Sequence, residues 1–415
     1  MFDANCEVVI SGLGVNASIG NNINEFWQNL LAGETGLKHQ AMLEEKQTPF
    51  KFGGYMGTLS PASELMREIF SQQDRAVQLA LNAAAQAVED SCLADIDPAK
   101  HTVAVVMGTT CGTNDSIEQN AFDEDWFNCD DFDVHKMQLH QNAFAQYGHE
   151  KIAHSISQAF NFNGPSYVVG TACASGNHAI GEAVNLIRSG QADIVLCGGA
   201  DAFTLLPTFG FYAMKSLASE KCTPFQKDRE GMLLGEGAGI LVLESRQSAI
   251  ARGLKPEVGV TAWALNCDAK NFAAPIASGE RCEELINLCL NEASLSPAEV
   301  DYINVHGTGT ELNDLMEARG IHGAFGNEVA RIKVSSIKGA TGHTLGAAGA
   351  LDGVASVLSI RNNCVPPNAP ITTTDENIGL DIPCEPLHIP VNRALSISFA
   401  FGGCNVATLF SRLEN

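Results

Sequence analysis

The chain of 415 residues contains 48 acidic and 25 basic side chains, which gives a formal net charge of −23. This negative balance argues against nucleic acid as a partner, because phosphate groups are bound through clustered lysine and arginine side chains. The N-terminus lacks the basic start and apolar core of a signal peptide, and no apolar run approaches the roughly 18 residues of a membrane span, so a cytoplasmic location is expected.

Strands and helices alternate over the first part of the chain, as the spacing of hydrophobic residues indicates. Strands are predicted at 8–11, 103–107, 193–197 and 240–243. Helices are predicted at 25–31, 76–88, 152–160 and 179–187. The least regular region, 120–146, holds many acidic residues and is expected to be an excursion that covers a site or a neighbouring subunit.

A similar set of elements follows a polar turn near 252–256. Strands are predicted at 258–264, 302–305, 332–335, 395–399 and 406–410. The layout is α/β, and a chain of this length can hold a doubled architecture. We therefore predict an N-terminal half at 1–255 and a C-terminal half at 256–415.

A glycine-rich segment near the N-terminus has the spacing of a dinucleotide-binding fingerprint. Gly12, Gly14 and Ala17 follow an apolar run, and Glu34 lies 20 residues after Gly14. In such a site the acid ends the second strand, whereas Glu34 follows Gly33 at an expected helix C-terminus. We interpret the segment as a tight structural turn and keep an NAD-dependent oxidoreductase as the weaker alternative.

The segment "GTACASG", residues 170–176, places Cys173 between Val168 and Val169, which are predicted to end a buried strand, and a predicted helix. Unpaired N–H groups and the helix dipole at such an N-terminus lower the pKa of a thiol, which favours a nucleophile. The alternative is a small cysteine buried as a hydrophobic side chain. The 13 cysteines contain no C-x-x-C pair and no metal-ligand spacing, so reduced thiols and no metal site are expected.

Two further segments carry candidate site residues. In "VHGTGTELND", residues 305–314, His306 follows a strand and precedes glycines and two threonines, so a ligand can approach it. In "SSIKGATGHTLGAAG", residues 335–349, Lys338 and His343 lie beside a glycine- and alanine-rich helix that must be buried. A lysine there needs a counter-charge, and Glu317 is the candidate partner.

These segments together resemble the beta-ketoacyl-ACP synthases, the elongating condensing enzymes of thiolase fold. The resemblance covers nearly the whole chain and also includes "ISGLG", "CGGAD", "DREGMLLGEGAG" and "SFAFGGCN" in that order. It implies a thiolase fold, in which two βαβαβαββ halves stack as a five-layered αβαβα sandwich and work as a dimer. It also favours Cys173 as the nucleophile.

The resemblance implies a decarboxylative Claisen condensation. Cys173 would take an acyl chain from the 4'-phosphopantetheine arm of acyl carrier protein, and the protein would need no cofactor of its own. His306 and His343 would stabilise the enolate formed from malonyl-ACP, and Lys338 with Glu317 would orient His343. The remaining roles implied are an oxyanion hole from the N–H groups of Cys173 and Phe401, pantetheine binding by Thr308 and Thr310, and gating by Phe401.

Several departures from the family pattern leave the pathway open. The gate sequence is Ala400-Phe-Gly-Gly-Cys-Asn405, the opposing loop 268–275 lacks a usual histidine and threonine, and Arg75 alone remains of a basic carrier-docking cluster. Docking is therefore expected to be weaker, or shifted to Lys215 or a partner chain. At the position that narrows the acyl pocket in the family, this chain has Cys111, whose alternative role is packing in the core.

We favour the catalytic ketosynthase subunit of a type II polyketide or polyene pathway, either as a homodimer or paired with a chain-length-factor homologue. The alternative is a housekeeping fatty-acid beta-ketoacyl-ACP synthase II. A noncatalytic chain-length factor is less expected, because such subunits lack the nucleophilic cysteine. A thiolase is also less expected, because it uses a second cysteine as its base. No nucleic acid and no membrane partner is expected.

Overall fold

The computed structural model describes residues 3, 6–62, 67–94, 96–118 and 147–414. The predicted excursion at 120–146 therefore lies outside the described residues. None of the helices in the described ranges has the length and apolar character needed to cross a membrane.

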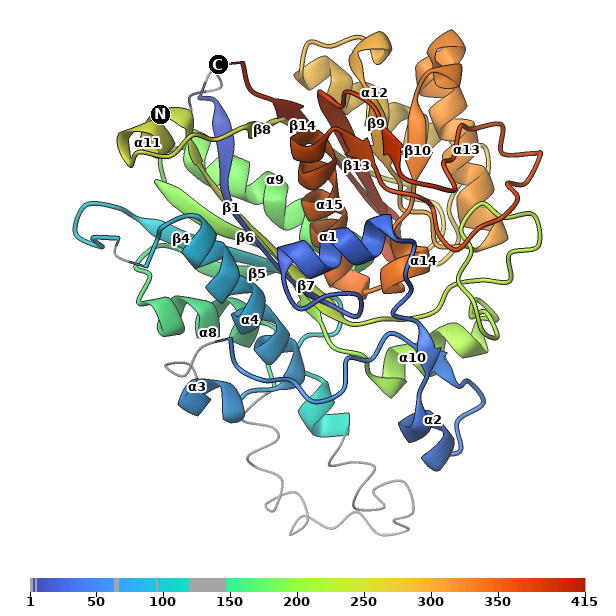
Figure 1. The fold of residues 1–415 in the computed structure, drawn as a ribbon, viewed down its shortest axis with the longest axis horizontal. Helices are drawn as coiled ribbons and strands as arrows, with labels where there is room; N and C mark the ends of the chain where they lie inside the picture. Colours follow the sequence, from blue (N-terminus) through green and yellow to red (C-terminus); the bar gives the residue numbers. More distant parts are fainter. Residues whose placement is uncertain (1–2, 4–5, 63–66, 95, 119–146, 415) are drawn as a thin grey trace.

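Ten strands form two five-stranded halves with the same strand pattern (Figure 1). The N-terminal half has the order β5 (Ser166–Val169), β4 (Val103–Gly108), β6 (Ile194–Asp201), β7 (Gly237–Ser245), β1 (Val8–Ala17). The C-terminal half has the order β10 (Lys333–Ser335), β9 (Tyr302–Asn304), β13 (Arg393–Phe399), β14 (Cys404–Arg412), β8 (Val258–Cys267). In each half the first three strands are parallel and the last two pair antiparallel. Among the described residues, the strands of the two halves are joined only where β1 and β8 pair, at Val8 with Val260 and at Val9 with Gly259.

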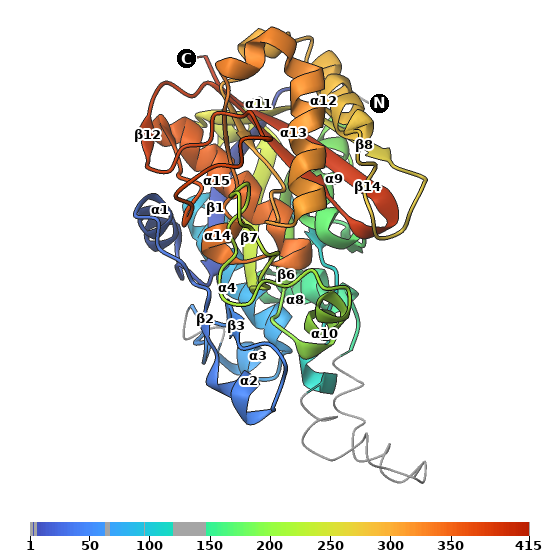
Figure 2. The ribbon, with the colours of Figure 1, turned by 90° about the vertical axis from the view of Figure 1, so that its right-hand side faces the viewer.

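Helices complete the five layers. The central layer consists of α9 (Ser175–Arg188) and α15 (Ala348–Asn362), which contact each other and strands of both halves (Figure 2). The outer face of the N-terminal half is covered by α4 (Arg75–Asp90) and α8 (Glu150–Phe160), and that of the C-terminal half by α12 (Glu280–Glu292) and α13 (Glu311–Phe325). The predicted five-layered αβαβα thiolase-type arrangement is confirmed, whereas the boundary at 255/256 stays a prediction.

Shorter elements connect these layers. The helices are α1 (Ile23–Leu31), α2 (Ala41–Glu45), α3 (Arg67–Ser71), α10 (Leu205–Ala213), α11 (Arg246–Ala251) and α14 (Lys338–Thr341). The strands are β2 (Lys38–His39), β3 (Phe52–Gly53), β11 (Cys364–Val365) and β12 (Leu387–His388). Short 3-10 turns precede both central helices, η3 (Ala172–Ala174) before α9 and η6 (Leu345–Ala347) before α15.

Small residues let the two central helices approach closely. A Cβ atom added to Gly176 would lie 2.7 Å from the Gly346 carbonyl oxygen and 2.8 Å from the Ala350 nitrogen. Such distances leave no space for a side chain. The glycine- and alanine-rich sequence after His343 is therefore explained by the close contact that brings the N-termini of α9 and α15 together.

Two local expectations need correction. Gly12 and Gly14 lie inside β1, which is longer than the predicted strand, and a Cβ atom on Gly14 would lie 1.8 Å from the Ala83 carbonyl oxygen on α4. These glycines serve strand–helix packing, so they form neither the tight turn that we predicted nor a phosphate-binding turn. Val168 and Val169 were expected to end a buried strand, yet β5 is the edge strand and both are half-buried.

Candidate active site

Cys173 lies in the 3-10 turn η3, directly before the N-terminus of α9. The turn is fixed by Ser175, whose Oγ donates to the Ala172 carbonyl oxygen at 2.6 Å and accepts the Thr171 N–H at 2.9 Å. Ala172 has a φ of 48°, a left-handed conformation that a non-glycine residue rarely adopts. The side chain of Cys173 is held in this way at the wall of a cavity.

The cavity has a volume of about 360 Å³ and brings together most of the predicted site residues. Its lining includes six of them: Cys173, His306, His343, Thr308, Thr310 and Phe401. Glu317 and Lys338 lie behind this wall, buried and in contact with the segments that carry the histidines. The cavity is therefore formed by both halves of the chain.

The expected low pKa of Cys173 is wrong for the ligand-free cavity. Burial raises the pKa of the Cys173 thiol to about 12, and the Asp201 carboxylate adds to this effect, while Lys338 opposes it. A buried apolar environment disfavours the thiolate more than the helix N-terminus stabilises it. The resting side chain is a neutral thiol, which must lose its proton as it attacks.

His306 and His343 face each other at the base of the cavity. Their ring centroids are 5.2 Å apart and the rings are nearly perpendicular, at 88°. Burial lowers the pKa of both histidines, and the positive charge of Lys338 lowers them further, to about 3 for His343. Both rings are therefore neutral near pH 7, and in the part of the chain that the structure describes neither Nδ1 atom has a hydrogen-bond partner.

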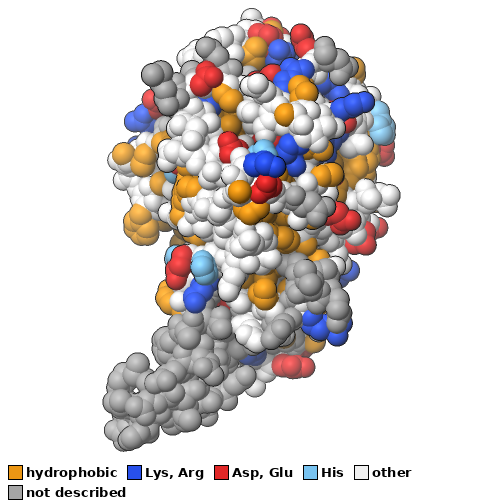
Figure 3. Space-filling view, turned by 90° about the vertical axis from the view of Figure 1, so that its left-hand side faces the viewer, with side chains coloured by type: hydrophobic (Ala, Val, Ile, Leu, Met, Phe, Trp, Pro, Cys, Tyr) orange, Lys and Arg blue, Asp and Glu red, His pale blue; other side chains and the backbone are white. Residues whose placement is uncertain are grey.

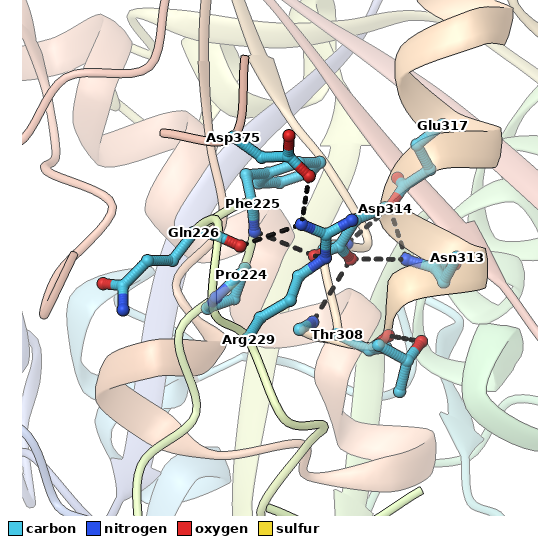
Figure 4. Close-up of polar contacts among 12 residues, drawn as sticks. Pro224, Phe225, Gln226, Arg229, Thr308, Asn313, Asp314, Glu317 and Asp375 are labelled. Carbon is cyan, nitrogen blue, oxygen red and sulfur yellow. Dashed lines mark hydrogen bonds and ion pairs between the residues drawn. The ribbon is translucent and has the colours of Figure 1, made fainter. Parts of the chain in front are cut away.

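Carboxylates on the first turns of α13 hold the loop that carries His306 (Figure 4). Glu317 accepts the N–H groups of His306 at 2.7 Å and Gly307 at 2.6 Å. Asp314 accepts the N–H group of Gly309 at 3.2 Å, and Asn313 donates to both carboxylates. Burial raises the pKa of Asp314 to about 6 and that of Glu317 to about 8, although these hydrogen bonds oppose the shift.

The predicted pairing of Lys338 with Glu317 is wrong. The Lys338 Nζ lies 3.0 Å from Asp352 Oδ2, and both side chains are 1% exposed. Asp352 projects from α15, whereas Glu317 is occupied by backbone N–H groups of the His306 loop. One signal in the sequence indicated this pair, since Asp352 is the only Asp, Glu, Lys or Arg between Lys338 and Arg361.

Arg229 is a second residue, after Asp352, that forms a buried ion pair beside the cavity and was not predicted from the sequence. Its guanidinium lies 3.3 Å from Asp314 and 2.8 Å from Asp375, and its side chain is 2% exposed (Figure 4). It thereby supplies a positive charge beside the carboxylate that holds Gly309. The signal in the sequence was a basic residue within "DREGMLLGEGAG", between two acidic neighbours.

The two threonines and Phe401, the predicted gate residue, line the same cavity. The hydroxyl groups of Thr308 and Thr310 are 2.9 Å apart. Phe401 is 37% exposed, with its ring centroid 5.5 Å from that of Phe211. Its neighbour Gly402 has a φ of 84° and donates its N–H to the Phe272 carbonyl oxygen at 2.7 Å.

Cys111 does not line the 360 Å³ cavity, but it packs against the apolar cluster that contains Cys173. Its N–H donates to Asp201 Oδ1 at 3.0 Å, and the same carboxylate accepts the Gly346 N–H at 2.7 Å. Its role in an acyl pocket stays a prediction. In the described ranges, no three His, Cys, Asp or Glu side chains are grouped so that they could hold a metal ion.

Comparisons with known proteins give one consistent family. The model of the beta-ketoacyl synthase N-terminal domain matches residues 5–249, and that of the C-terminal domain matches residues 259–372. A 3-oxoacyl-[acyl-carrier-protein] synthase 2 from Synechocystis sp. is 34% identical over 98% of both chains.

Solved structures are similar over almost the full length as well. The ishigamide ketosynthase/chain length factor has a TM-score of 0.88 and 30% identity, covering 99% of this chain and 100% of that chain. A type II polyketide synthase ketosynthase, solved in complex with its acyl-carrier protein and bound to the hexaketide, has a TM-score of 0.89 and 28% identity, covering 98% and 100%.

Proposed function

Because the chain belongs to the beta-ketoacyl synthase family of carbon–carbon bond-forming acyltransferases, we propose that Cys173, His306 and His343 perform its decarboxylative condensation. The observation that carries this assignment is that all three side chains line one cavity. A nucleophile there meets two neutral hydrogen-bond donors, as transfer of an acyl group and stabilisation of an enolate require.

In the first half-reaction, the Cys173 sulfur attacks the thioester carbonyl of an acyl chain on the phosphopantetheine arm of acyl carrier protein. The C–S bond to the arm breaks, so the acyl group ends on Cys173 and the arm leaves as a thiol. The thiol proton of Cys173 passes to the departing sulfur, and the neutral imidazoles in the cavity are able to relay it. The N–H groups of Cys173 and Phe401, both in short 3-10 turns, stabilise the tetrahedral oxyanion in this proposal.

In the second half-reaction, the malonyl group on a second carrier loses carbon dioxide. The electron pair of the broken C–C bond forms an enolate, whose oxygen accepts hydrogen bonds from His306 and His343. The carbanion then attacks the acyl group on Cys173, and the C–S bond breaks to release beta-ketoacyl-ACP and the free cysteine. Thr308 and Thr310, which line the cavity, bind the amides of the arm.

Lys338 and Glu317 act on the histidines from behind the cavity wall. The positive charge of Lys338 lowers the pKa of both rings and keeps them neutral, while Asp352 balances this charge. Glu317 sets the backbone position of His306 through two N–H groups. We assign both as positioning residues.

For the pathway, we propose a dedicated ketosynthase subunit of type II polyketide or polyene synthesis. The similar solved structures with a chain length factor or a polyketide carrier support this proposal. The second candidate is fatty-acid synthesis, which is favoured by the 34% identity to a 3-oxoacyl-[acyl-carrier-protein] synthase 2.

For the partner subunit, β5 is the half-buried edge strand of the sheet formed by the described residues, which supports pairing with a second copy or with a chain-length-factor homologue. For the carrier, Arg75 is excluded as a docking cation, because it is buried against Glu236 at 2.5 Å. Basic side chains on the face in Figure 3 are scattered among acidic ones and form no continuous patch. Lys215 is exposed and follows Met214 at the cavity wall, which supports docking there.

The test uses the purified protein with acyl- and malonyl-loaded carrier. Intact mass should show the acyl group on the wild-type chain and not on Cys173→Ala, and only malonyl-carrier, not acetyl-CoA, should support turnover. Acyl loading of another cysteine in the presence of an unmodified Cys173 would contradict the mechanism. Co-purification from the native host, followed by the mass of each subunit, distinguishes a homodimer from a heterodimer.

A further inference from the structure

Two cysteines lie opposite each other where β8 and β14 end beside the cavity. Cys267 is the last residue of β8, Cys404 is the first residue of β14, and the two are register partners. Both are free thiols in the structure, with Cys267 exposed and Cys404 half-buried. Neither has a part in the proposed condensation.

The hydrogen bonds around this pair define its geometry. The Asp268 N–H donates to the Gly403 carbonyl oxygen at 2.9 Å. This hydrogen bond joins the residue after Cys267 to the residue before Cys404, and not the two cysteines themselves. Cys267 and Cys404 therefore form a non-hydrogen-bonded antiparallel pair, in which Cα atoms lie about 4.5 Å apart and both side chains point to the same face. This separation is within the roughly 4.4–6.8 Å that a disulfide spans.

The pair joins the bases of two loops that line the cavity. Cys267 precedes the loop 268–275, and Cys404 follows the gate turn η7 (Phe401–Gly403). The loops are already in contact, since Gly402 donates to the Phe272 carbonyl oxygen and Asn405 donates to Asp268 Oδ1 at 2.7 Å. The sulfur of Cys267 lies 3.8 Å from the Gly402 carbonyl oxygen.

We propose that Cys267 and Cys404 are a modification site, at which oxidation forms a disulfide that ties the gate turn to the opposing loop and slows condensation. In the reaction with a small disulfide such as oxidised glutathione, one protein thiolate attacks and releases the first reduced thiol. The second protein thiol then displaces the other, so the protein loses two hydrogen atoms and the oxidant becomes two thiols. The exposed Cys267 meets the oxidant first.

The effect on the reaction rests on the proposed gating role of Phe401. The gate turn contains two adjacent glycines, Gly402 and Gly403, whose lack of a Cβ atom allows the backbone to change conformation, and its C-terminal end continues into Cys404. A disulfide between Cys404 and Cys267 fixes the gate turn in the conformation that the structure shows. Delivery of malonyl to an acylated Cys173 is the step that requires the gate to open.

The chemical part of the test is independent of activity. Cys173→Ala protein is treated with oxidised glutathione and digested without reduction, and mass spectrometry should find one peptide pair joined through residues 267 and 404. This linked peptide pair should disappear on reduction and should not form in the double variant Cys173→Ala/Cys404→Ser. Glutathione attached to Cys267 alone, or no linked peptide, would overturn the proposal.

The kinetic part uses wild-type protein whose Cys173 is first protected by an acyl group. Condensation after oxidation should fall by about tenfold to a hundredfold relative to the same protein kept reduced. Cys267→Ser and Cys404→Ser should each abolish this response, whereas the matched control Cys384→Ser, at another exposed cysteine, should retain it. A linked protein that condenses at the rate of the reduced protein would overturn the proposal, while a reduced protein that neither loads nor condenses would instead refute the proposed function.

Discussion

Replacing Asp352 with asparagine should destabilise the protein strongly, because it removes the counter-charge of a buried lysine. Lys338 and Asp352 are each 1% exposed and 3.0 Å apart, and Lys338 has no second carboxylate within hydrogen-bond distance among the described residues. Removing one partner of a buried ion pair typically costs about 3 to 5 kcal/mol. For a chain of 415 residues, whose unfolding entropy is about 0.9 kcal/mol/K, that corresponds to a fall in Tm of roughly 3 to 6 °C.

The double variant Lys338→Met/Asp352→Leu separates stability from catalysis. Apolar side chains in place of a buried ion pair are often neutral or stabilising, so the double variant should melt at the temperature of the wild type or above it. Although this variant is stable, its condensation should be slow, because the positive charge of Lys338 no longer lowers the pKa of His306 and His343. Differential scanning fluorimetry and the rate of malonyl-ACP decarboxylation give the two readouts. If Asp352→Asn melts like the wild type, the buried charge is compensated elsewhere and the reasoning fails.

Three further predictions concern the histidines and Cys111. His306→Ala and His343→Ala should each retain acyl loading of Cys173 but lose about 10²- to 10³-fold in malonyl decarboxylation, and normal condensation by either variant would contradict the assigned roles. The pKa of His343, about 3 in the folded protein and 6.5 in the unfolded chain, contributes stability that is present above pH 6.5 and lost as the pH falls toward 3. Urea unfolding should therefore show that, between pH 6 and pH 5, the free energy of unfolding of the wild type falls by about 1 kcal/mol more than that of His343→Gln. Equal losses of this free energy would mean that His343 is protonated in the folded state. Cys111→Ile should shorten the longest acyl chain accepted in a loading assay, through overpacking of roughly 1 to 3 kcal/mol, while an unchanged chain-length profile would remove Cys111 from the pocket.

Local sequence patterns predicted the parts of the site that lie at element ends. Cys173 and His306 were found because hydrophobic periodicity places each at the end of a strand, and the small residues after His343 indicated a buried helix. The pairing of Lys338 could not be predicted in this way. Glu317 on α13 and Asp352 on α15 are both buried acids, and the stacking of the layers alone determines which carboxylate the lysine reaches.

The wrong predictions for β5 and for the glycines of β1 have the same cause, since local sequence patterns do not show long-range contacts. Periodicity shows that Val168 and Val169 are apolar, but not that β5 is the last strand of the sheet and half-buried in the single chain. Gly12 and Gly14 indicated a turn because glycine is frequent in turns, whereas the structure uses them for the approach of α4 to β1. In both cases the deciding contact is with a segment far away in the sequence.

The two halves have matching strand orders, as expected of a chain that arose by duplication of one half. Each half sends a 3-10 turn into a central helix, and each turn begins with a residue of unusual φ, Ala172 at 48° and Leu345 at 52°. An ancestral duplication would have produced two equivalent helix starts around one cavity. One helix start carries Cys173, and the other begins two residues after His343. Under the proposed mechanism neither half holds a complete reaction, so a chain that lost the residues of one half would lose condensation and still keep the duplicated scaffold.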